Sequence, residues 1–136
     1  MKARSLLVVA ALAWISAAAA APAPEGADVY FISPEDGATV SNPVVVRFGL
    51  RGMGVAPAGT ERENTGHHHL LIDTEAPDPA SPIPSDDNHR HFGSGQTETV
   101  VELAPGTHTL QLLLGDFSHV PHQPPVMSER ITITVE

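Results

Sequence analysis

The sequence predicts an all-β fold in which antiparallel strands form a two-sheet sandwich, and three observations support this. Short runs alternate apolar with polar residues, which is the two-residue period of strands and not the 3.6-residue period of helices. Pro, Gly, Asn and Asp separate these runs, as they do between the strands of small β domains. The length, 136 residues, allows one domain with its own core and is short for two.

The first 21 residues are predicted to be a secretory signal peptide. Lys2 and Arg4 precede an apolar run at 6–15, and small alanines follow at 17–21. The run is too short to cross a bilayer of about 30 Å, and no second apolar stretch of about 20 residues follows it. We therefore expect a cleaved signal peptide at 1–21, a flexible lead at 22–26 and a β-sandwich domain at 27–136, in a periplasmic or secreted protein without membrane spans. The chain has no cysteine, so disulfides cannot stabilise it.

Six clear strands are predicted in the domain. The first, 27–33, ends at a Ser-Pro-Glu-Asp-Gly turn, and the second, 44–50, places Val44, Val46 and Phe48 on one face. The others are expected at 68–73, 97–103, 107–114 and 130–135, with a short seventh at 89–92. About seven strands in a domain of this size fit an immunoglobulin-like sandwich.

Three long segments, 52–66, 76–88 and 115–128, are predicted to be loops. They are rich in Gly and Pro, and the four prolines of 76–88 do not allow regular strand pairing there. Long loops within a compact domain are usually functional or disordered. Each of these loops leads into histidines or contains them.

Acidic residues dominate the charge of the chain. Seven Lys and Arg face 16 Asp and Glu, for a formal net charge of −9, which becomes −11 once Lys2 and Arg4 are removed. Nucleic acids and anionic membrane surfaces would be repelled, so neither is an expected partner. The eight histidines outnumber the five remaining cations. Histidine is the commonest metal ligand and also titrates near neutral pH.

Seven of the eight histidines form three clusters that are expected to border the loops. The clusters are His67, His68 and His69; His89 and His91; and His119 and His122. Residues two apart in a strand share a face, so His67 and His69 are expected to point together and His68 toward the side of Leu70 and Ile72. The Cα atoms of such residues lie about 6 to 7 Å apart, and at this separation two imidazoles can reach one ion.

These clusters predict a site for a divalent transition metal. A thiolate site is excluded because there is no cysteine, and only Met53 and Met127 could offer thioethers beyond the leader. An imidazole site, with or without a carboxylate, suits Cu(II) or Zn(II), and Ni(II) is a further candidate. We expect His67 and His69 to be the first ligands, then His119 and His122, then His89 and His91, with His68 as a ligand or beside one. The expected function is metal binding as a carrier, buffer or chaperone.

Three alternatives stay open at this point. The loops could form a periplasmic protein-interaction module whose histidines are structural, or the histidines could make the domain respond to pH near 6. A cupin-like metalloenzyme would use His67, His69 and His108, but the glycine and glutamate that a cupin needs around the first two are missing. The sequence favours binding over catalysis.

Two positions that include a histidine also have interpretations that do not involve a metal. Ser118 and His119 near Asp116 have the residue types of a catalytic triad, but neighbours on one loop rarely reach its geometry. His108 lies where sandwich domains often have a corner tyrosine, so we expect a structural ring that bonds back to the preceding turn.

Several motifs resemble one known family. They are Gly-His-His-His-Leu-Leu-Ile-Asp at 66–73, the His-x-His-Phe-Gly-x-Gly-Gln-Thr stretch at 89–97 and the segment 105–116. Together with 48–50, 52–59 and 119–122, they are similar to a bacterial family of exported domains, domain of unknown function 4399. The resemblance covers nearly all of the chain after the leader. It implies that the histidine-rich segments belong to the family pattern, and the family has no settled activity to transfer.

A fainter similarity, carried by the turn at 33–40, is to periplasmic copper-resistance proteins of sandwich fold. Many bacterial sandwich domains share this turn, so the similarity supports the fold more than it supports copper. Those proteins require a histidine as the first mature residue, whereas cleavage here would leave alanine or proline. That type of amino-terminal copper site is therefore excluded if the leader is cut as predicted.

Overall fold

The computed structural model describes residue 13 and residues 19–136, so the predicted signal peptide falls largely outside the described residues. The described chain is all-β and contains nine strands. No helix in this part of the chain is long and apolar enough to cross a membrane.

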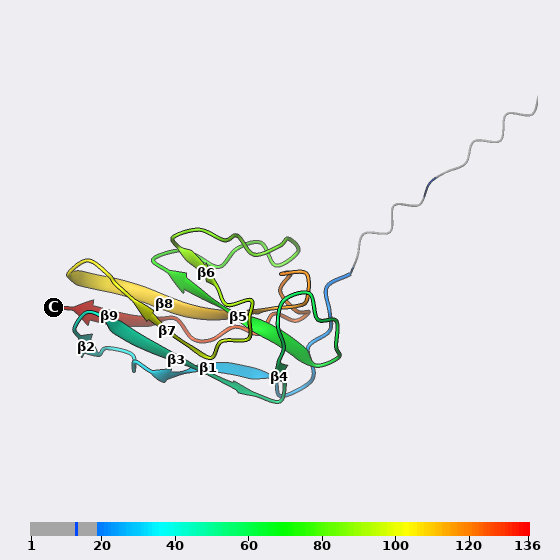
Figure 1. Ribbon diagram of the computed structural model, residues 1–136, viewed down its shortest axis with the longest axis horizontal. Helices are drawn as coiled ribbons and strands as arrows, with labels where there is room; N and C mark the ends of the chain where they lie inside the picture. Colours follow the sequence, from blue (N-terminus) through cyan, green and yellow to red (C-terminus); the bar gives the residue numbers. More distant parts are fainter. Residues whose placement is uncertain (1–12, 14–18) are drawn as a thin grey trace, which may run out of the picture.

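The strands form two sheets, which Figure 1 shows as two layers. The smaller sheet is antiparallel and has the order β1–β3–β7, with β1 at Asp28–Ser33, β3 at Val44–Arg51 and β7 at Glu98–Val101. The larger sheet has the order β2–β9–β8–β5–β4, and β6 also pairs with β5. Its strands are β2 (Thr39–Val40), β4 (Gly54–Val55), β5 (Thr65–Ile72), β6 (His89–His91), β8 (Gly106–Gly115) and β9 (Ile131–Val135). The β2–β9 and β4–β5 pairs are parallel, and the other pairs are antiparallel.

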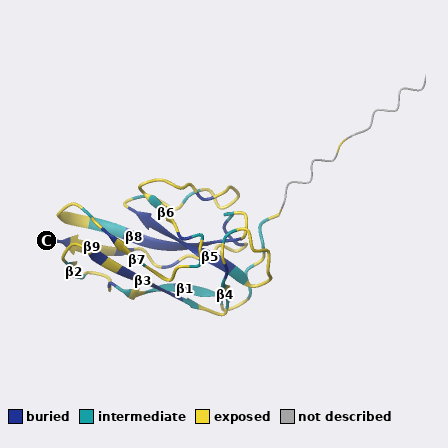
Figure 2. Cartoon of the chain, viewed as in Figure 1, coloured by how far each residue is buried: buried dark blue, intermediate teal, exposed yellow. Residues whose placement is uncertain are grey.

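The main hydrophobic core lies between the two sheets, where the strands are buried (Figure 2). Alternate residues of β9 are buried, namely Ile131, Ile133 and Val135, and the residues between them are exposed. On β3 the predicted inward face, with Val44, Val46 and Phe48, is likewise buried. The alternation in the sequence therefore predicted correctly which side of these strands faces the core.

The structure corrects two features of the predicted strand pattern. The segment 52–66, predicted to be a loop, contains β4 and the beginning of β5, which starts at Thr65 and not at 68. The two-residue strands β2 and β4 are too short to produce an alternating pattern, and for that reason they were missed. His67, His68 and His69, expected to border a loop, lie inside β5 and are buried.

β5 is buried on both of its faces. One face, with His68, Leu70 and Ile72, contributes to the core, and the ring of His68 lies 5.1 Å from that of Phe48. The opposite face is the outer face of the larger sheet and carries His67 and His69.

Part of the outer face of β5 is covered by the loop at 76–88. Ile83 of this loop packs with Leu71 of β5 and Leu113 of β8 in a second, smaller buried cluster. In Figure 1 the chain between β5 and β6 runs above the strands, on the side of the larger sheet away from β1 and β3. The outer face of β5 is therefore a sheltered place in which polar side chains can be brought together.

Candidate metal centre

Four imidazole rings meet on the outer face of the larger sheet. They belong to His67 and His69 of β5, His91 of β6 and His119 of the segment after β8. Their ring centroids are separated by 4.8 Å (His67–His69), 5.0 Å (His67–His91), 5.0 Å (His67–His119), 5.1 Å (His69–His91), 4.8 Å (His91–His119) and 6.3 Å (His69–His119). Each of the three histidine clusters in the sequence thus contributes at least one ring to this four-histidine cluster.

Ring nitrogens of His67, His91 and His119 converge within the four-histidine cluster. One nitrogen from each residue lies within 4.8 Å of the other two, and the Nε2 atoms of His67 and His91 are 3.2 Å apart. Nitrogens that share one tetrahedral ion at bonds of 2.0 to 2.1 Å lie about 3.3 Å from each other. His67 is buried, His119 is partly exposed and His91 is exposed, so a metal ion can approach from the solvent side.

Strand register and glycine residues position the rings on β5 and β6. His91 is the direct partner of His69 across the β5–β6 pair, which places both rings on the same face. A Cβ atom on Gly93 would overlap the ring of His91, and one on Gly115 would come within 2.7 Å of Cε1 of His69. Both glycines therefore leave space that the imidazoles need.

A tight turn after β8 holds His119 in place. The Oδ1 atom of Asp116 accepts hydrogen bonds from the backbone N–H groups of Ser118 and Val120 and from the Ser118 hydroxyl. His119 has a φ of 68°, a left-handed conformation that is uncommon outside glycine. Its carbonyl oxygen accepts a hydrogen bond of 2.7 Å from the N–H of Ile83, which joins this turn to the 76–88 loop.

Buried ring nitrogens of the cluster lack hydrogen-bond partners among the described residues. They are Nδ1 of His67 and both ring nitrogens of His69. Buried polar groups are normally hydrogen-bonded, and an unsatisfied one costs about 1 to 3 kcal/mol. A cation bound among the rings would give a partner to one nitrogen of His69, whereas the Nε2 atom of His67 already lies within hydrogen-bond distance of Nε2 of His91.

The environment favours the neutral form of three rings of the cluster, those of His67, His69 and His91. Burial, reinforced by the neighbouring imidazoles, lowers the pKa of His67 to about 4 and that of His69 to about 3. Burial and then His119 also lower the pKa of His91. Neutral imidazole is the form that binds metal ions, so these rings need lose no proton at neutral pH before they bind one.

The structure does not bring three other predicted ligands into the cluster. His68 faces the core because neighbouring strand residues point to opposite faces. His89 pairs with Leu71, away from His69, and its Nδ1 lies 2.7 Å from Oδ1 of Asp86. His122 is fixed by a hydrogen bond of 3.0 Å from its Nε2 to the backbone oxygen of Thr65.

His108 has the structural environment that its position predicts. Its Nε2 donates to the oxygen of Ala104 in the preceding turn at 2.7 Å, and its Nδ1 lies 2.6 Å from Oδ2 of Asp73. The bond to Asp73, followed by the bond to Ala104, raises the pKa of His108. Because both nitrogens are engaged, the cupin-like combination of His67, His69 and His108 is not assembled.

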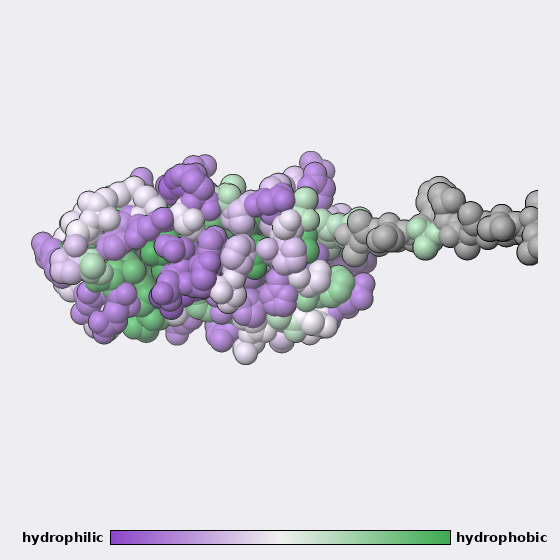
Figure 3. Space-filling model, turned by 90° about the horizontal axis from the view of Figure 1, so that it is seen from above, coloured by the Kyte–Doolittle hydropathy of each residue, from purple (hydrophilic) through white to green (hydrophobic). Residues whose placement is uncertain are grey.

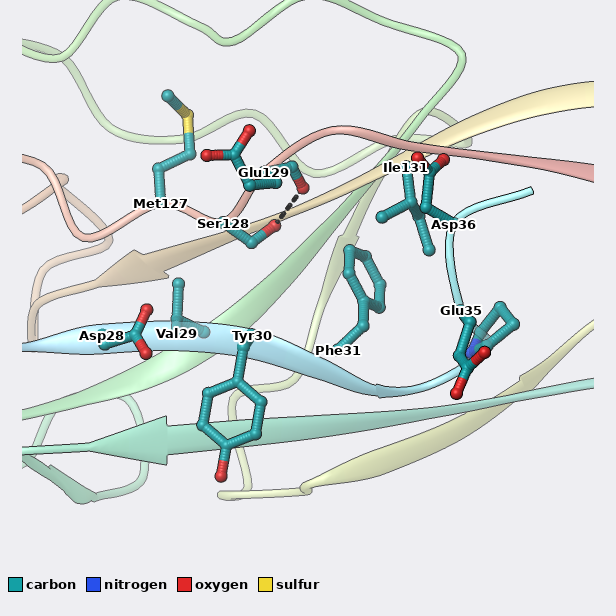
Figure 4. A pocket seen from close by; sticks show the side chains of 11 residues that line it. Asp28, Val29, Tyr30, Phe31, Glu35, Asp36, Met127, Ser128, Glu129 and Ile131 are labelled. Carbon is teal, nitrogen blue, oxygen red and sulfur yellow. Dashed lines mark hydrogen bonds between the residues drawn. The ribbon is translucent and has the colours of Figure 1, made fainter. Parts of the chain in front are cut away.

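A separate groove of about 320 Å³ lies between β1 and the segment that precedes β9 (Figure 4). Its lining includes the acidic side chains of Asp28, Glu35, Asp36 and Glu129, and Ser128 donates a hydrogen bond to the backbone oxygen of Glu129. None of its described lining residues is a histidine. The candidate metal centre is therefore distinct from this groove.

Comparison with known proteins identifies the family. No curated protein and no solved structure matches the chain. The family model described as Domain of unknown function (DUF4399) matches residues 46–136, which is more than half of the chain and includes all four rings of the cluster. The resemblance found in the sequence motifs is thus confirmed, and the chain belongs to the DUF4399 family.

Proposed function

We propose that this protein binds a divalent transition metal ion, Cu(II) or Zn(II), through His67, His91 and His119, with His69 beside them. The observation that carries the proposal is the convergence of three ring nitrogens, from segments far apart in the sequence, within 4.8 Å of one another. Imidazole is a preferred ligand of both ions. The protein would act as a carrier, buffer or chaperone for the metal, without turnover.

The electrostatic setting supports the proposal. The chain has a formal net charge of −9, and such a charge raises the local concentration of cations. On the face seen in Figure 3, hydrophilic side chains surround smaller hydrophobic areas. The buried rings of His67 and His69 stay neutral at pH 7, so the negative field attracts a cation without opposition from charged ligands.

We further propose that the metal is bound after export. In this proposal residues 1–21 are a cleaved signal peptide, the product is periplasmic or secreted, and the sandwich is of the immunoglobulin-like type. Amino-terminal sequencing of the product from a bacterial periplasm tests the export step. A first residue near 22 would support the step, and a product that starts at Met1 would contradict it.

Metal titration of the purified chain, produced without a polyhistidine tag, tests the central proposal. We expect one equivalent of Zn(II) or Cu(II) to bind with an affinity better than millimolar. His91→Gln and His119→Gln should each weaken metal binding by more than about tenfold. Loss of a residue that only orients a metal ligand already weakens metal affinity by about this factor, and loss of the ligand itself should weaken it at least as much.

His89→Gln is the matched control for the titration. His89 lies on the same three-residue strand as His91 but bonds to Asp86, so its replacement should leave metal affinity unchanged. Failure of the unmodified chain to bind either ion would contradict the metal proposal and favour the protein-interaction module. Equal losses in His89→Gln and His91→Gln would show that the ion binds elsewhere.

A further inference from the structure

The distances between the four ring centroids distinguish between coordination geometries. A ligand nitrogen lies 2.0 to 2.1 Å from the ion, which places an imidazole centroid about 3.2 Å away. Around a tetrahedral ion, all six centroid separations would then be about 5.2 Å. Around a square-planar ion, four separations would be about 4.5 Å and the two diagonals about 6.4 Å.

The observed separations fit a distorted tetrahedron. Five of them lie between 4.8 and 5.1 Å, and only the His69–His119 separation, 6.3 Å, is longer. If that pair were one diagonal of a square, His67 and His91 would form the other diagonal. Their centroids are only 5.0 Å apart and their Nε2 atoms only 3.2 Å apart, so the four rings do not lie in one plane around a common point.

Paired strands prevent the rings from moving easily into a plane. Hydrogen-bonded register fixes His67 opposite Gly115 and His69 opposite both Leu113 and His91. This register fixes the backbone positions of three of the four rings, and burial of His67 and His69 restricts the side-chain rotations that could flatten the arrangement. Of the four rings, only that of His119 lies outside the strands, on the turn after β8.

His69 has the properties of a fourth ligand. Its side chain is buried, and both of its ring nitrogens lack a partner in the described part of the chain. Its ring is 4.8 Å from that of His67 and 5.1 Å from that of His91. For a regular tetrahedron, the His69–His119 separation of 6.3 Å would have to shorten by about 1.1 Å.

We propose that the site is a four-imidazole zinc centre formed by His67, His69, His91 and His119. Its tetrahedral shape favours Zn(II) over ions that prefer planar or octahedral coordination, such as Ni(II). This inference rests on the proposed metal-binding function and narrows it to one ion and four ligands. Zn(II) has no geometric preference of its own and is almost always tetrahedral in closed protein sites. Selectivity among divalent ions comes from geometry and ligand type more than from raw affinity, so the tetrahedral arrangement is what would discriminate against Ni(II).

Titration of the unmodified chain with Co(II), Ni(II) and Zn(II) tests the shape of the site. We expect Co(II) to give the intense visible absorption of a four-coordinate ion, and one equivalent of Zn(II) to remove it. Ni(II) should bind at least about tenfold more weakly than Zn(II), because four imidazoles in a tetrahedron do not offer Ni(II) planar or octahedral coordination. A weak, six-coordinate Co(II) spectrum, or Ni(II) affinity equal to that of Zn(II), would overturn the inference.

Replacement of His69 tests the fourth ligand. His69→Leu should weaken Zn(II) binding about 10- to 100-fold and change the Co(II) spectrum. His68→Leu, which alters the neighbouring residue on the core-facing side of β5, should change neither. Unchanged Zn(II) affinity in a folded His69→Leu variant would overturn the four-ligand centre while the three-histidine site stands. If none of the three ions binds to the unmodified chain, the zinc centre fails, and the metal-binding proposal fails with it only if Cu(II) does not bind either.

Discussion

The four-histidine cluster and His108 place the same side chain in two opposite environments. At His108 both ring nitrogens face oxygen acceptors, from Asp73 and Ala104, and the pKa is raised. In the cluster, His67 and His69 face other imidazoles, three of their four ring nitrogens are buried without a partner among the described residues, and the pKa of both is lowered. A histidine held by protein acceptors is stabilised as a cation and offers no lone pair. His67 and His69 stay neutral at pH 7, and a neutral imidazole keeps one lone pair that a metal can use.

Acid should destabilise the metal-free protein through β5, and this is the largest expected effect. The pKa values of His67 and His68, about 4, and of His69, about 3, lie below the ordinary value of 6.5. Between pH 4 and pH 6.5 the unfolded chain therefore binds more protons than the folded protein does. The contribution of these histidines to the free energy of unfolding is full above pH 6.5 and is lost as the pH falls toward 4. At about 1.4 kcal/mol per pKa unit, the loss reaches several kcal/mol, comparable to the whole stability of many domains. Urea unfolding between pH 4 and pH 8 measures it.

His108 should show the opposite sign in the same experiment. Its pKa is raised in the folded state, so its contribution is full below pH 6.5 and is lost as pH rises through the folded value. The stability difference between the unmodified chain and His108→Gln should thus be larger at pH 5.5 than at pH 8.5. A difference that does not vary with pH would show that the bond to Asp73 does not require the charged ring.

Zinc should stabilise the protein through the cluster and not through His108. At a free Zn(II) concentration of 100 times Kd, binding adds about 2.7 kcal/mol to the free energy of unfolding. His108→Gln should retain this increment, although it lowers the stability of the metal-free protein. His119→Gln, which alters a partly exposed ring on a turn, should lose most of it. Thermal unfolding with and without Zn(II) gives the increment for each variant. Equal increments in His108→Gln and His119→Gln would contradict the claim that zinc binds at the cluster and not at His108.

Gly93→Ala tests whether the backbone makes room for the cluster. The added methyl group would overlap the ring of His91 and should displace it, which weakens Zn(II) binding about tenfold, or by about 1.4 kcal/mol. Ser94→Ala is the matched control, because it alters the next, exposed residue. A direct titration of both variants decides the question. Unchanged affinity in Gly93→Ala would mean that His91 does not need its present position.

His68→Leu should have the smallest effect. His68 is buried in the core with both ring nitrogens unpartnered among the residues described, beside Phe48. Replacing an unsatisfied polar ring by an apolar side chain of similar size should leave the stability at pH 7 unchanged, or raise it by about 1 kcal/mol. Urea unfolding checks this value. A loss of more than about 2 kcal/mol would show that His68 has a polar role in the core.

Much of the sandwich could be predicted from the sequence because its strands are buried on one side. Ile131, Ile133 and Val135 alternate with exposed residues, and β9 has the expected limits within one residue. β5 could not be delimited in this way, because its two faces are both buried and its histidines have the polarity of a loop. Strand alternation did separate His67 and His69 from His68, since that separation depends only on the two-residue period.

The membership of the metal centre depended on contacts that the sequence does not contain. His89 and His91 have equal local spacing, and only the pairing of β6 with β5 places His91 opposite His69. His119 and His122 lie on one segment, and the Asp116 turn directs His119 into the cluster. The hydrogen bond from His122 to Thr65 could be located only after β5 was placed.

Anomalous diffraction at the zinc absorption edge, from crystals of the untagged chain grown with Zn(II), would locate the ion. We expect one strong peak on the outer face of β5, about 2.0 to 2.1 Å from ring nitrogens of His67, His69, His91 and His119. A peak bound to His89, His108 or His122 instead, or no ordered zinc at the four-histidine cluster, would contradict it.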